Sequence, residues 1–164
     1  MVPILIVGGR RERLLADMLA GAFSACERDD FSLEIAPRPE AFIAPYGLLI
    51  AARPLVHAAP PSLSPGIVAL MEGSNRRAAA MLSATGNAAV CCGMSGRDTV
   101  TLSSLRDDAA LVCLQRTVTT LSGGAVEPCE IPVRLSRRRH KRDILFAAAA
   151  LILGDCPTDE GFRI

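Results

Sequence analysis

Aromatic residues are scarce in this chain of 164 residues, which has five Phe, one Tyr and no Trp. Half of the residues are hydrophobic, so a sizeable core can still form, and it must be built from aliphatic side chains and alanine. Such small side chains suit the close packing of helices on a sheet. The length predicts a single domain over residues 1–164.

The chain also lacks a large net charge and long apolar runs. A formal net charge of +1 provides no global field toward nucleic acid or an anionic membrane. No apolar stretch approaches the ~20 residues of a membrane span, and the first apolar run is too short for a signal peptide. We therefore expect a cytoplasmic protein with reduced cysteines and with neither nucleic acid nor membrane as a partner.

The usual catalytic and metal-binding patterns are missing as well. The adjacent Cys91 and Cys92 cannot form a Cys-x-x-Cys clasp, and no paired Cys and His residues have the spacing of a zinc site. There is no Gly-x-Ser-x-Gly elbow. A cysteine nucleophile would need a base, and nothing in the sequence brings His57 or His140 near Cys91. We predict no metal, no cofactor and no catalytic residue, which favours a protein that is not an enzyme.

The most informative absence lies at the first strand-to-helix junction, where an apolar run ends in Gly8-Gly9. A nucleotide-hydrolase phosphate loop would continue to Gly-Lys-Ser/Thr, and a dinucleotide fingerprint would place a third glycine near Arg13. Neither is present. Free amides at the helix start could still bind an anion with the help of Arg10 or Arg11, and the alternative is a simple tight turn. Gly8, Gly9 and Arg10 are the first candidate ligand-binding residues.

Apolar runs alternate with helical segments over the first 98 residues. Uninterrupted aliphatic runs predict buried strands, and apolar residues at three- and four-residue spacing predict amphipathic helices. Ser74 is the expected N-cap of the second helix, and Gly86-Asn87 its end. The predicted strands are residues 3–9, 31–36, 46–52, 66–71 and 88–92, the helices residues 10–27 and 75–84, and the proline-rich connections residues 37–45 and 57–64.

From residue 99 onward the pattern changes to strand-like segments with no helix between them. Ser122-Gly123-Gly124 predicts a hairpin, and Pro128 and Pro132 predict that the last of these segments is an edge strand. A helix that is apolar almost all round then ends at Gly154 and should be buried. The strand-like segments are residues 99–105, 109–121 and 126–135, the buried helix is residues 142–154, and residues 159–164 form a tail.

These elements together predict an α/β fold. Its main part, residues 1–98, is a mostly parallel, Rossmann-like sheet with flanking helices, because strands that alternate with helices form such sheets. An antiparallel β-ribbon, residues 99–136, and a closing segment with the buried C-terminal helix, residues 137–156, complete the domain.

Three stretches resemble the central, ATP-binding domain of the Mur ligases, which join amino acids to a UDP-linked peptidoglycan precursor. Residues 66–75 resemble the family's strand and its Asn/Asp-rich turn, and residues 88–100 are similar to the strand, glycine and loop that follow. Residues 140–150 resemble the family's Gly-x-His-Asn…Asn-Ala-x-Ala-Ala helix start. The likeness spans residues 66–156.

The departures from that family are extensive. Its Gly-Lys-Thr/Ser loop is absent at residues 8–14, Arg139 stands at or beside its glycine, and Lys141 and Ile144 replace its two asparagines. No acidic metal ligand can be matched, and the family's further N- and C-terminal domains have no counterpart in these residues. The resemblance therefore implies a shortened bacterial relative that keeps the fold and lacks the ATP machinery.

A second candidate site follows the strand at residues 88–92. Ligands of open α/β sheets gather outside the carboxyl ends of the strands, and Gly93, Ser95, Arg97 and Asp98 would suit a small polar or phosphorylated ligand. The alternative is a polar connection into the ribbon. The basic run at residues 137–142 has no interleaved aromatic residues and is interpreted as a solvated link.

Three functions are consistent with these sequence patterns. The leading one is a non-catalytic, Mur-ligase-like domain that binds a partner protein or a small anionic ligand. The second is a small transferase-like enzyme that acts on a phosphorylated metabolite through the Cys91–Thr99 loop. The third is a structural module that forms a homodimer by pairing the ribbon, residues 111–121, edge to edge.

Overall fold

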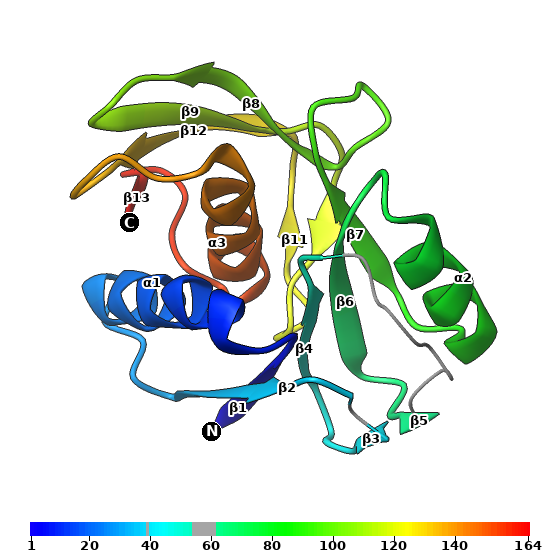
Figure 1. Ribbon diagram of the computed structural model, residues 1–164. Coiled ribbons are helices and arrows are strands. Elements are labelled where there is room, and N and C mark those ends of the chain that lie inside the picture. The colour runs from blue at the N-terminus through cyan, green and yellow to red at the C-terminus, as the bar shows by residue number, and fades with distance from the viewer. Residues whose placement is uncertain (39, 54–61) are drawn as a thin grey trace.

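The computed structural model describes residues 1–38, 40–53 and 62–164. It is an α/β fold built on a nine-stranded mixed sheet in the order β13-β12-β9-β8-β7-β6-β4-β1-β2 (Figure 1). The predicted fold class is confirmed. The sheet strands are β1 (Val2–Val7), β2 (Phe31–Ala36), β4 (Gly47–Ala51), β6 (Ile67–Glu72), β7 (Ala89–Cys92), β8 (Val100–Leu105), β9 (Ala109–Leu114), β12 (Cys129–Arg134) and β13 (Phe162–Arg163).

The first half of the chain forms the parallel part of the sheet. β1 pairs with β2 and β4, β4 pairs with β6, and β6 pairs with β7, all in parallel. The five predicted strands are therefore confirmed, with ends that shift by one or two residues. The predicted connections hold a further short pair, β3 (Ala41–Phe42) with β5 (Ser62–Leu63), while residues 39 and 57–61 of those connections lie outside the described residues.

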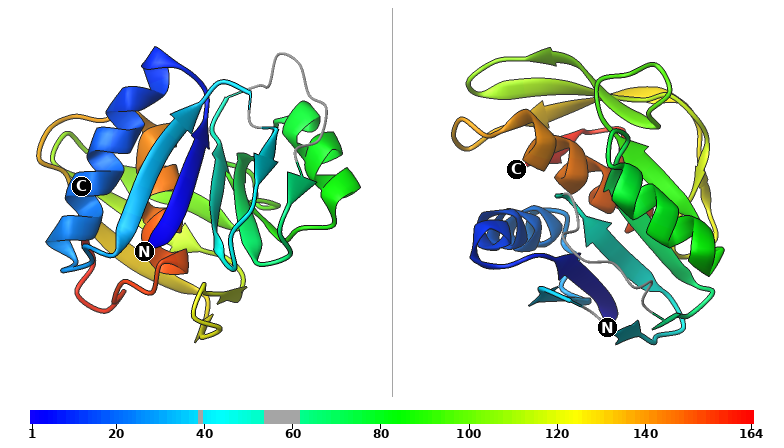
Figure 2. Two further views of the ribbon diagram at one scale, coloured as in Figure 1. Left: turned by 90° about the horizontal axis from the view of Figure 1, so that it is seen from below. Right: turned by 45° about the vertical axis from the view of Figure 1, so that its right-hand side comes forward.

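Helices cover both faces of the sheet. A single 3₁₀ turn, η1 (Arg10–Glu12), leads into α1 (Arg13–Ala25), which packs with α3 (Lys141–Leu153) on one face. α2 (Arg76–Thr85) covers the opposite face, as the right-hand view of Figure 2 shows. The core has two layers because successive residues of a strand point to opposite faces, so Ile4 and Ile6 face α1 while Leu5 and Val7 face the α2 side.

The N-cap of α2 is Asn75, and the expectation of Ser74 was wrong by one residue. The Asn75 side chain accepts a hydrogen bond from the Ala78 amide at 3.0 Å and donates one to the Arg53 carbonyl at 3.0 Å. Asparagine caps helices as well as serine does, and this one also ties the helix start to the end of β4. The predicted helix end is confirmed, because Gly86 has the left-handed φ of 73°.

The ribbon differs from the prediction in its edges. β9 pairs antiparallel with both β8 and β12, so both sides of residues 109–114 are in use. β12 is not an edge strand along its whole length, because β13 pairs with it in parallel at Val133 and Arg134, beyond Pro132. The expected tail thus holds a strand. The predicted hairpin is confirmed as β10 (Val118–Thr119) paired with β11 (Ala125–Val126).

The C-terminal helix α3 is buried, as predicted. Residues 144–153 are all buried, and the ribbon lies on the side of α3 away from α1 (Figure 1). The C-cap of α3 is Gly154, as predicted, but Gly154 does not have a left-handed φ. The left-handed residue is Asp155, with a φ of 61°, and Gly154 is needed because a larger residue would not fit. A Cβ on Gly154 would lie 2.7 Å from Phe23 Cε1 and 2.9 Å from Phe31 Cζ. None of the helices in the described part of the chain is long and apolar enough to cross a membrane.

Candidate functional site

Both sequence-predicted loops follow parallel strands and lie at the carboxyl edge of the sheet. Gly8 and Gly9 come directly after β1, and the loop from Gly93 to Asp98 comes directly after β7. β4 and β6 separate the two strands in the sheet, so the loops share an edge without forming one site. The structure gives them different surroundings.

The turn after β1 is filled by the protein's own carboxylate. Glu12 is 4% exposed, and its Oε2 accepts a hydrogen bond of 2.8 Å from the Gly9 amide. Its Oε1 lies against Arg53 Nε as an ion pair whose N–H direction is not aligned for a hydrogen bond. A Cβ on Gly8 would lie 2.6 Å from Glu12 Cγ. The position where a phosphate would meet these amides is therefore occupied by Glu12.

A cavity of about 480 Å³ opens at the other loop. It lies between the carboxyl ends of β6 and β7 and the N-terminus of α3. Cavities of this size accommodate small organic ligands. The lining residues are Glu72, Gly73 and Ser74 after β6, Cys92, Gly93, Met94, Ser95, Arg97 and Asp98 after β7, and Lys141, Arg142, Leu145 and Phe146 on α3.

Asp98 holds the floor of this cavity together. Its side chain is 5% exposed, and its Oδ2 accepts a hydrogen bond of 2.9 Å from the Ser95 amide. A Cβ on Gly93 would lie 2.8 Å from the Asp98 carboxyl carbon, and a Cβ on Gly73 would collide with Oδ1. The two glycines are thus required where the carboxylate packs between the ends of β6 and β7. Oδ1 has no hydrogen-bond donor among the described residues.

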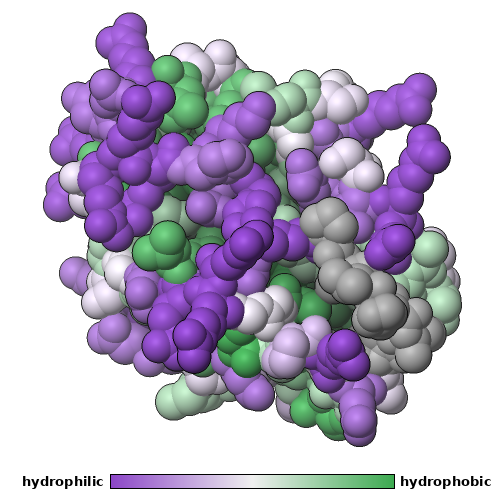
Figure 3. Space-filling view, viewed as in Figure 1, coloured by the Kyte–Doolittle hydropathy of each residue, from purple (hydrophilic) through white to green (hydrophobic). Residues whose placement is uncertain are grey.

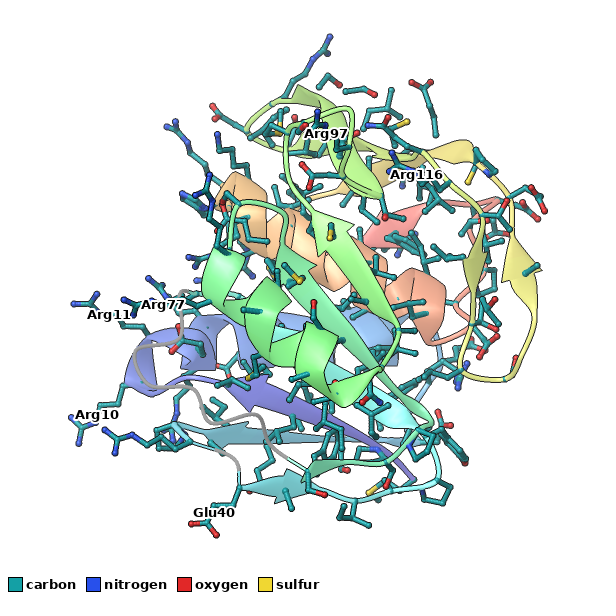
Figure 4. All side chains as sticks on the ribbon, turned by 90° about the vertical axis from the view of Figure 1, so that its right-hand side faces the viewer. Arg10, Arg11, Glu40, Arg77, Arg97 and Arg116 are labelled. Carbon is teal, nitrogen blue, oxygen red and sulfur yellow. The ribbon has the colours of Figure 1, made fainter. Side chains whose placement is uncertain are left out.

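Arg116 fixes the same loop from outside. Its guanidinium donates hydrogen bonds to the carbonyls of Arg97 at 2.8 Å, Asp98 at 3.0 Å and Gly96 at 3.3 Å. Figure 4 shows Arg116 and Arg97 at the same end of the molecule, above β7. The loop therefore has fixed backbone contacts on both sides, which leaves the Arg97 guanidinium exposed and without a partner among the described residues.

The charged groups of the cavity are mostly unpaired. Among the described residues, neither the Glu72 carboxylate nor the Lys141 ammonium has a hydrogen-bond or ion-pair partner. Arg142 differs, because its guanidinium nitrogens lie 3.0 and 3.2 Å from Asp143 Oδ1. Cations and carboxylates thus line one cavity without neutralising one another.

The two thiols of β7 do not fit a nucleophile. Burial raises the pKa of Cys92, which is fully buried, and the charges of Cys91, Asp98 and Glu72 raise it further. Burial and the Asp98 charge likewise raise the pKa of Cys91. A raised pKa keeps a thiol protonated and unreactive at neutral pH. In the described residues no three His, Cys, Asp or Glu side chains are grouped so that they could hold a metal ion.

Exposed charges of one sign gather at parts of the two edges of the sheet. The carboxyl edge carries the exposed Arg10, Arg11 and Arg77, which project on the same side in Figure 4, and hydrophilic side chains crowd this face in Figure 3. The opposite edge carries Glu27, Asp29 and Asp30 before β2 and Asp155, Asp159 and Glu160 after α3. The net charge of +1 is therefore a sum over groups at different edges, and the carboxyl edge holds both signs because Glu72 and Asp98 line its cavity.

The second predicted site is assembled as a cavity wall, and the first is separate from it. Gly93, Ser95, Arg97 and Asp98 line the cavity, whereas Gly8, Gly9 and Arg10 do not. The sequence reasoning missed the contributions of β6 and α3. The rule about carboxyl strand ends applies equally to β6 and could have suggested Glu72. The residues missed are Glu72, Gly73 and Ser74 after β6, and Lys141, Arg142, Leu145 and Phe146 on α3.

The basic run at residues 137–142 is also more than a solvated link. Lys141 and Arg142 line the main cavity, and a second hollow of about 440 Å³ lies between Leu105 and residues 138–141. Burial and the neighbouring Arg137 lower the pKa of Arg139, whose Nε is buried without a partner among the described residues. His140 caps α3, its Nδ1 accepting from the Arg142 amide at 3.3 Å.

The carboxyl-edge cavity is therefore the candidate site. No model of a known protein family matches this chain, and no curated protein matches its sequence.

Proposed function

We propose that this protein binds a small anionic ligand in the cavity between β6, β7 and α3. The observation that carries the proposal is the Lys141 ammonium, which is unpaired at the mouth of the cavity beside the first turn of α3. A helix N-terminus attracts negative charge, and the exposed Arg97 on the opposite wall adds to this attraction. The turn after β1 is not part of this site, because Glu12 already takes the Gly9 amide.

The proposal includes a relationship to the central domain of the Mur ligases, without its ATP chemistry. The succession of a parallel sheet, an antiparallel ribbon and a closing helix supports such a relationship. The chain lacks the Gly-Lys-Ser/Thr sequence, and Glu12 lies where a phosphate would meet the turn. A binding role without catalysis is consistent with both observations.

The test is a ligand screen followed by site-directed variants. Amide NMR shifts would be recorded with inorganic phosphate, ethyl phosphate, ATP, a UDP-sugar and NAD. We expect at least one anion to shift the amides of Gly93, Ser95 and Asp98 while leaving Gly9 unchanged. Lys141→Ala should weaken that binding about fivefold to tenfold, the effect of roughly 1–1.4 kcal/mol that one charge-assisted contact contributes.

The matched control is Arg11→Ala, which removes an exposed cation from the same sheet edge but from outside the cavity. It should leave the affinity within twofold, because screening weakens exposed charges beyond a Debye length of roughly 8–10 Å. Equal losses in both variants would show only a general attraction to a basic surface, and would refute a site in the cavity. Shifts centred on Gly9, or ATP hydrolysis, would also refute the proposal.

A further inference from the structure

The lining of the cavity is not that of a simple anion site. A cavity for a bare phosphate would be lined by donors and cations, yet Glu72 and Asp98 both face this one. Two carboxylates next to a bound phosphate repel it unless the ligand brings a group that they can bind. The lining therefore contains information about the rest of the ligand.

The unpaired charges of the cavity balance one another. Arg142 is engaged by Asp143, which leaves Arg97 and Lys141 as unpaired cations. The carboxylates of Glu72 and Asp98 belong to residues that line the same cavity, and the described residues provide no donor for Glu72 or for Oδ1 of Asp98. Opposite charges that share a cavity without pairing leave room for a ligand that pairs with both.

Depth separates the two kinds of charge. Lys141 and Arg97 are exposed at the mouth, Glu72 is half-buried at the end of β6, and Asp98 is 5% exposed. Water competes less for a carboxylate that is partly withdrawn from solvent, so a ligand donor that reaches Glu72 or Asp98 gains more than one at the surface. Leu145 and Phe146 add an apolar wall between these ends.

We propose that the ligand is a zwitterion, a small molecule with a primary amine at one end and a phosphate or carboxylate at the other. Its ammonium group donates to Glu72 and Asp98, and its anionic group lies at Lys141, Arg97 and the first turn of α3. This inference rests on the proposed function, because it takes the cavity to be the site and adds the class of molecule that fills it.

The test compares ligands that differ only in the amine. 2-Aminoethyl phosphate is paired with ethyl phosphate, and 3-aminopropanoate with propanoate, in calorimetric titrations of the full chain in buffer containing EDTA. We expect the amine to tighten binding at least fivefold in one pair, and the pair that shows the gain identifies the anionic group. Glu72→Gln should abolish the gain while leaving the binding of the amine-free partner the same or tighter.

A matched variant separates the two ends of the ligand. Lys141→Ala should weaken both members of the responding pair by a similar factor, because it removes a contact to the group that they share. Neither Glu72 nor Lys141 is buried, so both variants should fold, and circular dichroism would verify this.

The outcomes distinguish this inference from the proposed function. If an amine-free anion binds in the cavity and its amine-bearing partner binds no more tightly, the zwitterion is refuted and the anion site stands. A gain that survives in Glu72→Gln refutes it as well, as does tight anion binding that appears only when EDTA is replaced by Mg²⁺. If none of the four compounds, nor any anion of the screen, binds in the cavity, the proposed function fails and the inference fails with it.

Discussion

Glu12 in the turn after β1 and Asp98 in the loop after β7 are the two charged residues that are buried in the described part of the chain. Each carboxylate accepts a hydrogen bond from the backbone amide three residues before it, at Gly9 and Ser95 respectively. Each also packs on a glycine where a Cβ would collide, at Gly8 and Gly73. The two turns thus use the same local device at the same edge of the sheet.

The difference lies in what surrounds the second carboxylate oxygen. Arg53 neutralises Glu12, so the turn after β1 is complete without a ligand. Asp98 Oδ1 has no such partner, and Glu72 and Lys141 beside it are also unpaired. A buried carboxylate that pairs with a cation of the chain, as Glu12 does, leaves no place for a ligand. A buried carboxylate whose nearest free cation lies on the other side of a cavity, as for Asp98, can contribute to a binding site.

The largest effect is expected from Asp98→Ala. Removing the carboxylate costs a charge-assisted hydrogen bond and empties the space between the ends of β6 and β7, a loss of about 1.5–3 kcal/mol in the free energy of unfolding. Urea denaturation would measure it, and Asp98→Asn, which retains an acceptor, should lose less. Equal losses in the two variants would mean that the negative charge, which both remove, holds the loop, and that neither the packing nor a neutral acceptor does.

The next effect concerns pH and the inner wall of the cavity. The Cys92 pKa is raised above its ordinary value of 9.0 by burial, so above about pH 9 the unfolded chain releases this proton while the folded chain keeps it. The contribution of Cys92 to stability should therefore be complete below pH 9 and fall by about 1.4 kcal/mol per pH unit above it. Burial also raises the pKa of Cys156, which adds a loss of its own over the same range.

Cys92→Ala tests this prediction by difference. The variant loses packing by the same amount at every pH, so its stability curve should lie lower but fall less steeply between pH 9 and 10. Parallel curves for the two proteins would show that the Cys92 thiol ionises freely, and that water reaches the back of the cavity in the folded state.

Glu12→Ala is expected to have a smaller effect on stability, about 1 kcal/mol, because Arg53 is 37% exposed and water can solvate it once Glu12 is gone. The variant should gain the ability to bind an anion in this turn. With the Gly9 amide and Arg53 released, inorganic phosphate at millimolar concentration should shift the Gly9 amide resonance in the variant and not in the native protein. If phosphate shifts the Gly9 amide resonance in neither protein, Glu12 is not what keeps an anion out of the turn, and the comparison between the two turns fails.

The smallest effect on stability is expected from Lys141→Ala. The side chain is exposed and has no partner among the described residues, so urea denaturation should give a change within about 0.5 kcal/mol. Together with the weakened anion binding expected of the same variant, this would assign Lys141 to ligand binding alone. A loss above 1.5 kcal/mol would assign it a structural role instead.

Much of the fold could be predicted because its signals are local. The aliphatic runs of β1, β4 and β6 are long and uninterrupted, and a buried parallel strand requires no more than that. The errors arose where distant segments meet. The edge assigned to β12 was wrong in part because β13 reaches it from about thirty residues further along the chain, and two residues give no periodicity from which to predict a strand.

The residues of the candidate site also fall into those that local sequence could predict and those that depend on distant segments. Gly93, Ser95, Arg97 and Asp98 could be proposed because they follow one predicted strand, and the position of a loop at a carboxyl edge is a rule of the fold. Lys141 and Arg142 could not be assigned to the same cavity, because their place depends on how α3 packs across the sheet. The role of Glu12 was hidden for a related reason, since its partner Arg53 belongs to the end of another strand.

By itself the sequence determined an aliphatic α/β core, a first turn without the Gly-Lys-Ser/Thr needed to bind a triphosphate, and a net charge near zero. Only the tertiary structure decided where those charges lie: exposed arginines and two buried carboxylates share the carboxyl edge, and an arginine pairs with one of these carboxylates while the other lines an open cavity. The physical reason is that composition gives the sum of the charges, whereas binding depends on their separation, burial and pairing, which are set by contacts between residues far apart in the chain.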